Sequence, residues 1–202
     1  SETYFSFGNS TTLRFFEWSD GARESSRKIY VSKAVHISAV WISFSLSFEN
    51  GVKVGEDYWF NSGEEAKIKL SARLTNGTSV GVKVLSPRGE QTASTYFVTK
   101  DYDKRTSVSF YFEGIKLASA NLVFTSVKLS AVKGGSLVKV VAQWTHDGSR
   151  IAGIKIKCLE TGQEEVSNYL GEAYFKIVSN STLTFIPTSF VNGITSFYEA
   201  EA

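Results

Sequence analysis

The sequence predicts an all-β protein built as a sandwich of packed sheets. Apolar and polar residues alternate one by one along several segments, which is the pattern of a strand with one buried face. Aromatic residues make up 14% of the chain, and aromatic side chains favour the half-buried surface of a pleated sheet. No segment shows the apolar spacing of an amphipathic helix.

Long alternating segments dominate the first two thirds of the chain. The expected strands there are 42–48, 66–74, 80–84, 108–112 and 127–131. The second and third of them are joined through Asn76-Gly77, a dipeptide typical of a tight hairpin turn, in which we expect Asn76 to take a positive φ. Residues 20–28 are polar, so we expect a loop or a single helical turn there.

Beyond Gly134-Gly135 the expected strands are shorter and more regularly spaced. They cover 137–145, 151–159, 164–168, 172–178 and 182–187. Short strands at this spacing are typical of a sandwich. We therefore predict a boundary at this glycine pair, with domains at 11–133 and 134–202 and a separate N-terminal strand at 1–10.

Two short stretches of the C-terminal part carry a resemblance to a known group. Residues 151–156 (IAGIKI) have a glycine followed by alternating apolar residues, and 170–175 (LGEAYF) have a glycine, an alanine and an aromatic residue at alternate positions. In this respect 138–187 resembles immunoglobulin-like modules of extracellular proteins, including the carboxypeptidase-regulatory-like and bacterial Ig-like groups. Asn168-Tyr169 stands where those modules usually have threonine and aspartate. The resemblance implies an immunoglobulin-like β-sandwich with a structural or adhesive role.

Composition argues against several classes of partner. The chain has 22 basic and 20 acidic residues, a net charge of +2, which is too even for a protein that binds nucleic acid. No apolar run approaches the roughly 20 residues of a membrane-spanning helix. The sequence has no Met, so we expect Ser1 to be a mature N-terminus left by removal of a leader, and the protein to be extracellular.

Cysteine and histidine are too few to suggest a reactive or metal-binding centre. Cys158 is the single cysteine, so the chain forms no disulfide with itself, and we expect it to be a small buried apolar residue. Together with His36 and His146 it shows no zinc-binding spacing.

Gly77 to Gly81 matches G-x-S-x-G, the pattern around the nucleophile of many hydrolases, with Ser79 at its centre. That nucleophile sits between a strand and a following helix. Here a hairpin turn precedes the serine and an alternating strand follows it. We therefore expect no enzyme.

Calcium is the one metal that the sequence leaves open. Asp101-Tyr102-Asp103 begins like a calcium-binding loop, but the glycine and the closing glutamate of such a loop are missing. A solvated acidic turn fits better, so we expect no cofactor. Calcium held between subunits by Asp101, Asp103, Glu199 or Glu201 stays possible.

Three asparagines match the acceptor pattern for N-glycans, N-x-S/T. They are Asn9, Asn76 and Asn180, all in expected turns or loops, where a glycan can project into water. Asn76 also has a role in its turn, which by itself accounts for an asparagine there.

The N-terminal segment 3–8 is apolar and aromatic, although a free chain end is normally polar and frayed. Such a segment either pairs within its own sheet or completes the open sheet of a neighbouring copy. The second arrangement gives head-to-tail contacts that do not close, and hence a filament. Tyr4, Phe5 and Phe7 would then form the donor strand; Tyr4 and Phe5 point to opposite faces, so the face that enters the neighbour is open.

An aromatic first strand, a serine- and threonine-rich all-β sequence, glycan acceptor sites and no disulfide occur together here. This combination resembles subunits of archaeal donor-strand-linked surface filaments, such as thread-type and bundling pilins. The resemblance implies a pilin-like glycoprotein subunit of an extracellular filament or pilus at the cell surface, whose partner is another copy of itself.

Two other functions stay open. One is a carbohydrate-binding or adhesin module that uses Trp18, Trp59 or Trp144 as a stacking platform. The other is a surface-layer or viral coat subunit, which would differ from a pilin in the geometry of its lattice.

Overall fold

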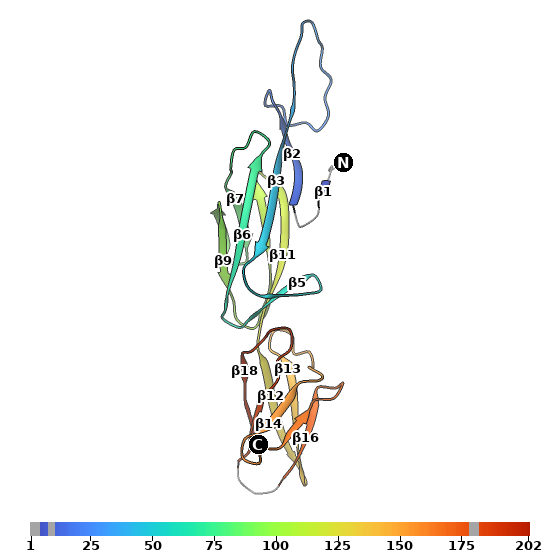
Figure 1. Ribbon diagram of the computed structural model, residues 1–202, viewed down its shortest axis with the longest axis vertical. Coiled ribbons are helices and arrows are strands. Elements are labelled where there is room, and N and C mark those ends of the chain that lie inside the picture. Colours follow the sequence, from blue (N-terminus) through green and yellow to red (C-terminus); the bar gives the residue numbers. More distant parts are fainter. Residues whose placement is uncertain (1–4, 8–10, 178–181) are drawn as a thin grey trace. The chain divides into compact units, whose positions relative to one another are not determined.

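The computed structural model describes residues 5–7, 11–177 and 182–202. The predicted donor residue Tyr4 and the acceptor sites Asn9 and Asn180 lie outside these ranges. The described residues form strands and loops without a helix (Figure 1), which confirms the all-β fold class.

The strands form four sheets, which we name A to D, with neighbours given in order. Sheet A consists of β1 (Phe5–Phe7), β2 (Thr11–Trp18), β3 (Ala39–Phe48), β6 (Glu65–Leu74) and β9 (Tyr96–Lys100). Sheet B consists of β4 (Val52–Val54), β5 (Asp57–Asn61), β11 (Ile115–Thr125), β10 (Lys104–Phe112), β7 (Val82–Ser86) and β8 (Gly89–Ala93). Sheet C consists of β16 (Glu172–Lys176), β13 (Leu137–Trp144), β12 (Val127–Gly134) and β18 (Phe197–Tyr198). Sheet D consists of β15 (Glu164–Val166), β14 (Lys155–Cys158), β17 (Thr184–Pro187) and β19 (Ala200–Glu201).

The chain divides into two compact units whose segments interleave in sequence. Unit 1 comprises Ser1–Glu49, Lys67–Val98 and Ser107–Ala120. Unit 2 comprises Asn50–Ala66, Thr99–Thr106 and Asn121–Ala202. Sheets C and D lie wholly within unit 2.

The core of unit 1 is aromatic, as the alternating strands predict. Phe44 of β3 is fully buried and packs against Phe110 of β10, with ring centroids 5.6 Å apart, and Phe97 of β9 meets the same ring edge-on. Each such side chain contributes roughly 1.5–3 kcal/mol by leaving water. Along β6 every second residue is buried while the lysines between them are exposed, so one face of this strand carries the core.

The strand β2 contains a bulge that brings one more aromatic residue into the unit 1 core. Its pairing with β3 shifts register between Phe15 and Glu17. The extra residue, Phe16, is buried and packs against Phe112, with ring centroids 5.1 Å apart. A bulge reorients side chains in this way because two residues face one on the partner strand.

Residues 19–38 form the long loop between β2 and β3 (dark blue in Figure 1). Backbone hydrogen bonds close its base, from Trp18 N to Ala22 O and from Ser19 N to Ser38 O. The segment 20–28, for which we expected a loop or one helical turn, is loop throughout.

Sheets C and D pack face to face around one core in unit 2, which confirms the predicted β-sandwich. Phe175 of sheet C lies against Phe185 of sheet D, with ring centroids 4.9 Å apart. Trp59 of β5 packs against the same cluster of buried residues. Val138, Val140 and Ala142 of β13 supply much of the sheet C side.

The predicted boundary at Gly134-Gly135 falls on a hairpin turn within sheet C. Strand β12 pairs with β13 from Val127↔Trp144 to Gly134↔Leu137, and Gly135 takes a φ of 61° in the turn. The alternating residues 127–131, on the near side of this turn, therefore belong to the same sheet as the strand beyond it. The glycine pair marks a change of direction of the chain, since glycine serves tight turns as readily as linkers.

Candidate functional site

The N-terminal strand β1 pairs within its own chain. It is the outermost strand of sheet A and lies antiparallel to β2, with Phe5 opposite Leu13, Ser6 opposite Thr12 and Phe7 opposite Thr11. The pairing is short, since it covers three residues of each strand. One edge of β2 is covered by β3, and β1 covers the opposite edge.

Asn76, a predicted glycan acceptor, lies exposed in the hairpin turn after β6. Its side-chain oxygen accepts a hydrogen bond from the N–H of Thr78 at 2.9 Å. The positive φ that we expected at Asn76 is instead taken by Gly77, at 86°. Asparagine acts here as the side-chain acceptor of the turn, and glycine supplies the left-handed backbone.

The serine of the G-x-S-x-G sequence lies in extended chain. Ser79 is exposed and forms an isolated bridge with Arg73, and the segment continues into strand β7. The strand-then-helix turn that exposes a hydrolase nucleophile is not formed around it.

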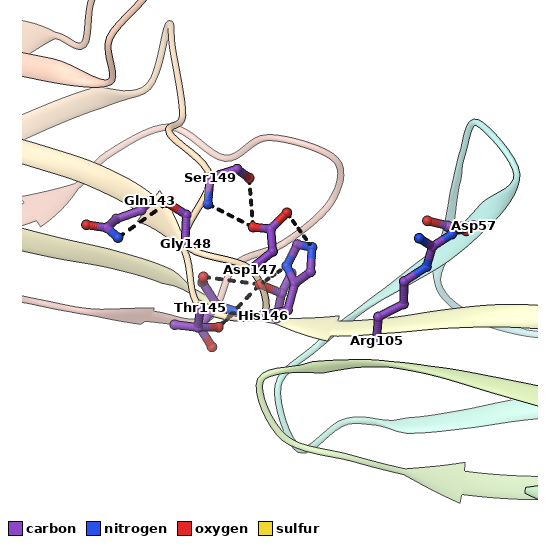
Figure 2. A network of polar contacts seen from close by, with 10 residues as sticks. Asp57, Arg105, Gln143, Thr145, His146, Asp147, Gly148 and Ser149 are labelled. Carbon is purple, nitrogen blue, oxygen red and sulfur yellow. Dashed lines mark hydrogen bonds and ion pairs between the residues drawn. The ribbon is translucent and has the colours of Figure 1, made fainter. Parts of the chain in front are cut away.

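A cluster of polar side chains surrounds His146, in the turn after β13 (Figure 2). The ring nitrogen Nδ1 lies 3.0 Å from Thr125 Oγ1, and Nε2 lies 3.3 Å from Asp147 Oδ2. The imidazole is 8% exposed and packs edge-on against Trp59, with ring centroids 5.2 Å apart.

A second chain of hydrogen bonds continues from this cluster. Thr125 Oγ1 lies 3.3 Å from Thr145 Oγ1, which accepts a hydrogen bond from the N–H of Ser126 at 2.8 Å. Thr145 donates to Asp103, and the hydroxyl of Tyr198 donates to the other oxygen of Asp103 at 3.4 Å. Asp103 takes a φ of 49°, an unusual conformation for a residue other than glycine.

The hydroxyl of Thr125, the imidazole of His146 and the carboxylate of Asp147 follow one another in the order found in a serine hydrolase. Such a hydroxyl acts as a nucleophile only where a substrate can reach it. Thr125 has no exposed surface, so its hydroxyl cannot meet a substrate in solution. This row of side chains instead ties the end of β11 to the turn after β13, because it satisfies polar groups that would otherwise be buried without partners.

Burial has the largest effect on the pKa of His146. Burial lowers the pKa of His146, and the nearby Arg105 acts in the same direction, while Asp147 and Asp57 oppose it. For Asp147, burial acts to raise the pKa, but hydrogen bonds from the N–H and hydroxyl of Ser149 and the contact with His146 bring it below its ordinary value. The imidazole is therefore held in its neutral form.

The side chain of Asn61 connects β5 to the segment that precedes β18, a role that no sequence pattern indicated. Its side-chain oxygen accepts hydrogen bonds from the N–H groups of Thr195 and Ser196, at 2.7 and 2.8 Å. Glu64 orients the amide by accepting from its Nδ2 at 3.0 Å. Asn61 is more than 130 positions from Thr195 and Ser196 in the chain, so only the folded structure brings them together.

The three tryptophans proposed as stacking platforms are engaged in packing. Trp144 is 7% exposed and lies edge-on against Trp59, with ring centroids 4.9 Å apart. The indole N–H of Trp18 donates to Glu24 O at 2.8 Å, and the guanidinium of Arg27 lies 5.9 Å from its ring centre. The exposed aromatic side chains of unit 2 include several tyrosines, among them Tyr174 and Tyr198, and the phenylalanines Phe190 and Phe197.

The acidic residues considered for calcium do not converge. Asp101 is 7% exposed and pairs with Lys104 Nζ at 3.0 Å, whereas Asp103 is held by Thr145 and Tyr198. Over residues 11–177 and 182–202, no three potential metal-binding side chains come together. Cys158 is buried, as predicted, and its thiol lies 3.5 Å from a carboxylate oxygen of Glu160. No helix in the part of the chain that the structure describes is long and apolar enough to span a membrane.

Comparison with known proteins places the chain in no family. No family model matches it, and no curated protein matches it either. Among solved structures, the D00-D0 domain of intimin is 10% identical, with a TM-score of 0.39 over 78% of this chain and 98% of that one. Native alpha-2-macroglobulin from Escherichia coli, spanning domains NIE-MG1, is 11% identical, with a TM-score of 0.27 over 71% of this chain and 92% of that one. The three N-terminal domains of the bacteriophage RB49 outer capsid protein Hoc are 8% identical, with a TM-score of 0.36 over 100% of this chain and 96% of that one. These likenesses are too distant to carry a function.

Proposed function

We propose that this chain is a structural subunit of an extracellular filament, whose copies join head to tail by donor-strand complementation. The observation that supports it is the position of β1 at the edge of sheet A, paired with β2 at only three positions. Main-chain hydrogen bonds are the same whether the added strand comes from the same chain or from another. The edge Thr11–Leu13 of β2 is therefore the acceptor in either case.

The exchange requires only that the connection between β1 and β2 reaches across to the next copy. Strand β1 then leaves its own β2 and occupies the equivalent edge of that copy, with Phe5 opposite the neighbour's Leu13. Such an exchange of identical elements needs no new surface, and when it is not reciprocal it builds an open chain of subunits. An edge left empty would expose unpaired N–H and C=O groups, which favours refilling it.

A pair of introduced cysteines tests the exchange. In a background in which the native thiol is removed by Cys158→Ala, Phe5→Cys and Leu13→Cys place two thiols directly opposite each other in the β1–β2 register. If β1 is donated, oxidation of assembled protein gives a ladder of covalent oligomers on a non-reducing gel.

Disulfide formation confined to single chains, in material that forms filaments by negative-stain microscopy, would contradict the proposal. The matched control is Phe5→Cys with Thr12→Cys. Thr12 lies opposite Ser6 and so faces the other side of the sheet, and this pair should give far less of either product.

A further inference from the structure

The outer face of sheet C carries two similar hollows, one toward each end. Along β13, Val138, Val140 and Ala142 point into the core, so Lys139, Val141 and Gln143 lie on the opposite face. The register of the sheet extends this face across the neighbouring strands. We call these residues and their register partners on β12, β16 and β18 the outer face of sheet C.

The first hollow lies beside β18. Tyr198 is the register partner of Lys128, which is in turn the partner of Gln143. A hollow of about 430 Å³ is lined by these three residues and by Asp103, among others. Tyr198 is 52% exposed, and its hydroxyl lies 3.4 Å from Asp103 Oδ2.

The second hollow lies beside β16 and repeats the same combination. Tyr174 is the register partner of Lys139, and Lys139 is the partner of Val132. These three residues line a hollow of about 220 Å³, together with Lys133, Gly134 and Leu137. Tyr174 is 45% exposed, and its hydroxyl donates to Glu172 Oε2 at 2.6 Å. Lys139 Nζ lies 3.3 Å from Glu172 Oε1.

Each hollow therefore presents a tyrosine ring and a lysine ammonium group, with a carboxylate at the tyrosine hydroxyl. Asp103 itself lines the first hollow, whereas Glu172 lies beside the second, in contact with Tyr174 and Lys139. Tyr174 on β16 and Tyr198 on β18 are three strand spacings apart, and their register positions on β12, Val132 and Lys128, are four residues apart. The two tyrosines are therefore about 20 Å apart across the face. A tyrosine ring offers an apolar surface, the ammonium donates hydrogen bonds and the carboxylate accepts them. A pyranose ring needs this set, since its C–H groups form an apolar face and its hydroxyls both donate and accept.

Charge decides between the classes of ligand that stack on tyrosine. In each hollow a carboxylate lies beside the tyrosine hydroxyl, and Glu172 also pairs with Lys139. A nucleic-acid strand or an acidic glycan would bring its own negative charge next to Asp103 and Glu172, which is unfavourable. An uncharged, hydroxyl-rich ligand complements both hollows.

We propose that the outer face of sheet C binds a neutral oligosaccharide, long enough to place one pyranose ring on Tyr174 and another on Tyr198. The bound chain crosses β13 and β12 between the two hollows. This site uses other residues and another unit than the β1–β2 edge, so it is independent of filament formation.

The test begins with an array of neutral, acidic and sulfated oligosaccharides, to which the full chain is applied alongside single-stranded oligonucleotides. We expect binding to neutral oligosaccharides. Titration calorimetry with the best-bound one should show that Tyr174→Ala and Tyr198→Ala each weaken binding about tenfold, because each removes one apolar platform. Tyr174→Phe and Tyr198→Phe keep the ring and should retain most of the affinity.

Tyr169→Ala is the matched control, since Tyr169 is 85% exposed and lies outside this face. It should bind like the unchanged protein, and circular dichroism of every variant confirms the fold. No binding to any neutral oligosaccharide, binding restricted to acidic glycans or oligonucleotides, or unchanged affinity in the Tyr174→Ala, Tyr198→Ala double variant would each overturn the proposal. Filaments formed normally by these variants would leave the proposed polymerisation standing whatever the outcome.

Discussion

The imidazole of His146 is buried in a neutral form, and this makes the folded state sensitive to acid. In an unfolded chain a histidine titrates near pH 6.5, whereas burial lowers the pKa of His146 in the folded protein. Between the two pKa values the unfolded chain binds more protons. The stabilisation is therefore complete above about pH 6.5 and is lost as the pH falls through that value toward the folded pKa.

We expect the free energy of unfolding, measured in urea, to fall between pH 7 and pH 5. The variant His146→Gln should be less stable at pH 7 but should lose less stability over this range. His36→Gln is the matched control, because His36 is exposed in the β2–β3 loop. A pH profile of His146→Gln that parallels that of the unchanged protein would assign the acid sensitivity to other groups.

Gly171 occupies a position where no other residue fits. Its φ is 72°, and an added Cβ would lie 2.8 Å from the carbonyl oxygen of Ala142. Gly171→Ala should therefore destabilise the protein by roughly 2–3 kcal/mol in urea unfolding, since backbone strain and a clash add together.

Gly162→Ala separates these two contributions. Gly162 has nearly the same φ, 71°, but nothing lies within 4 Å of an added Cβ. We expect a loss of roughly 1–2 kcal/mol there, from strain alone. If Gly171→Ala and Gly162→Ala lower the free energy of unfolding equally, the clash with the carbonyl of Ala142 does not contribute to the destabilisation.

Residue patterns in the sequence indicate local roles but miss those that depend on distant partners. The turn at Asn76-Gly77 and the burial of Cys158 both follow from local chemistry, and the structure confirms them. For Asp103 the sequence predicts a solvated acidic turn and leaves a calcium ligand possible, whereas its side chain contacts Thr145 and Tyr198, which are distant in sequence. No spacing in the sequence carries that information.

At the scale of single elements, strands with strict alternation are predicted closely. The expected 66–74 is β6 at Glu65–Leu74, because its lysines and buried residues alternate without a break. The expected 151–159 shortens to β14 at Lys155–Cys158, because the N–H of Ile151 donates to the carbonyl of Ala142 and Gly153 turns the chain with a φ of 76°. Strands as short as β18 and β19 leave no periodic signal, so the sequence does not predict them.

Strand β1 is the element on which assembly depends. Deletion of residues 1–8 removes it and leaves the edge Thr11–Leu13 of β2 uncovered. The buried core residues of both units that the structure describes, from Phe16 onward, are all retained in the shortened chain, so we expect circular dichroism to show a folded all-β protein. In negative-stain microscopy this protein should form no filaments, or irregular aggregates through the open edge. Normal filaments from the shortened chain would contradict donor-strand complementation.

At the scale of the whole molecule, composition and periodicity predict the fold class but not the division of the chain. Unit 2 combines Asn50–Ala66, Thr99–Thr106 and Asn121–Ala202. Because unit 2 consists of three separate segments, no single change in composition along the chain can mark where it begins. Part of the reason is the parallel pairing of β5 with β11, from Asp57↔Asn121 to Asn61↔Thr125, which joins segments far apart in the sequence.

The pairing of β12 with β18 also has a consequence for how the protein is made. Ser126 and Ser196, which hydrogen-bond beside this pairing, are 70 residues apart. A ribosome adds about 5–20 residues per second, so the edge of β12 waits roughly 4–14 seconds for the strand that covers it. During that interval the edge is open to pairing with other nascent chains. Slower translation lengthens the exposure, so the yield of correctly folded protein should depend on synthesis rate and on chaperones that shield strand edges.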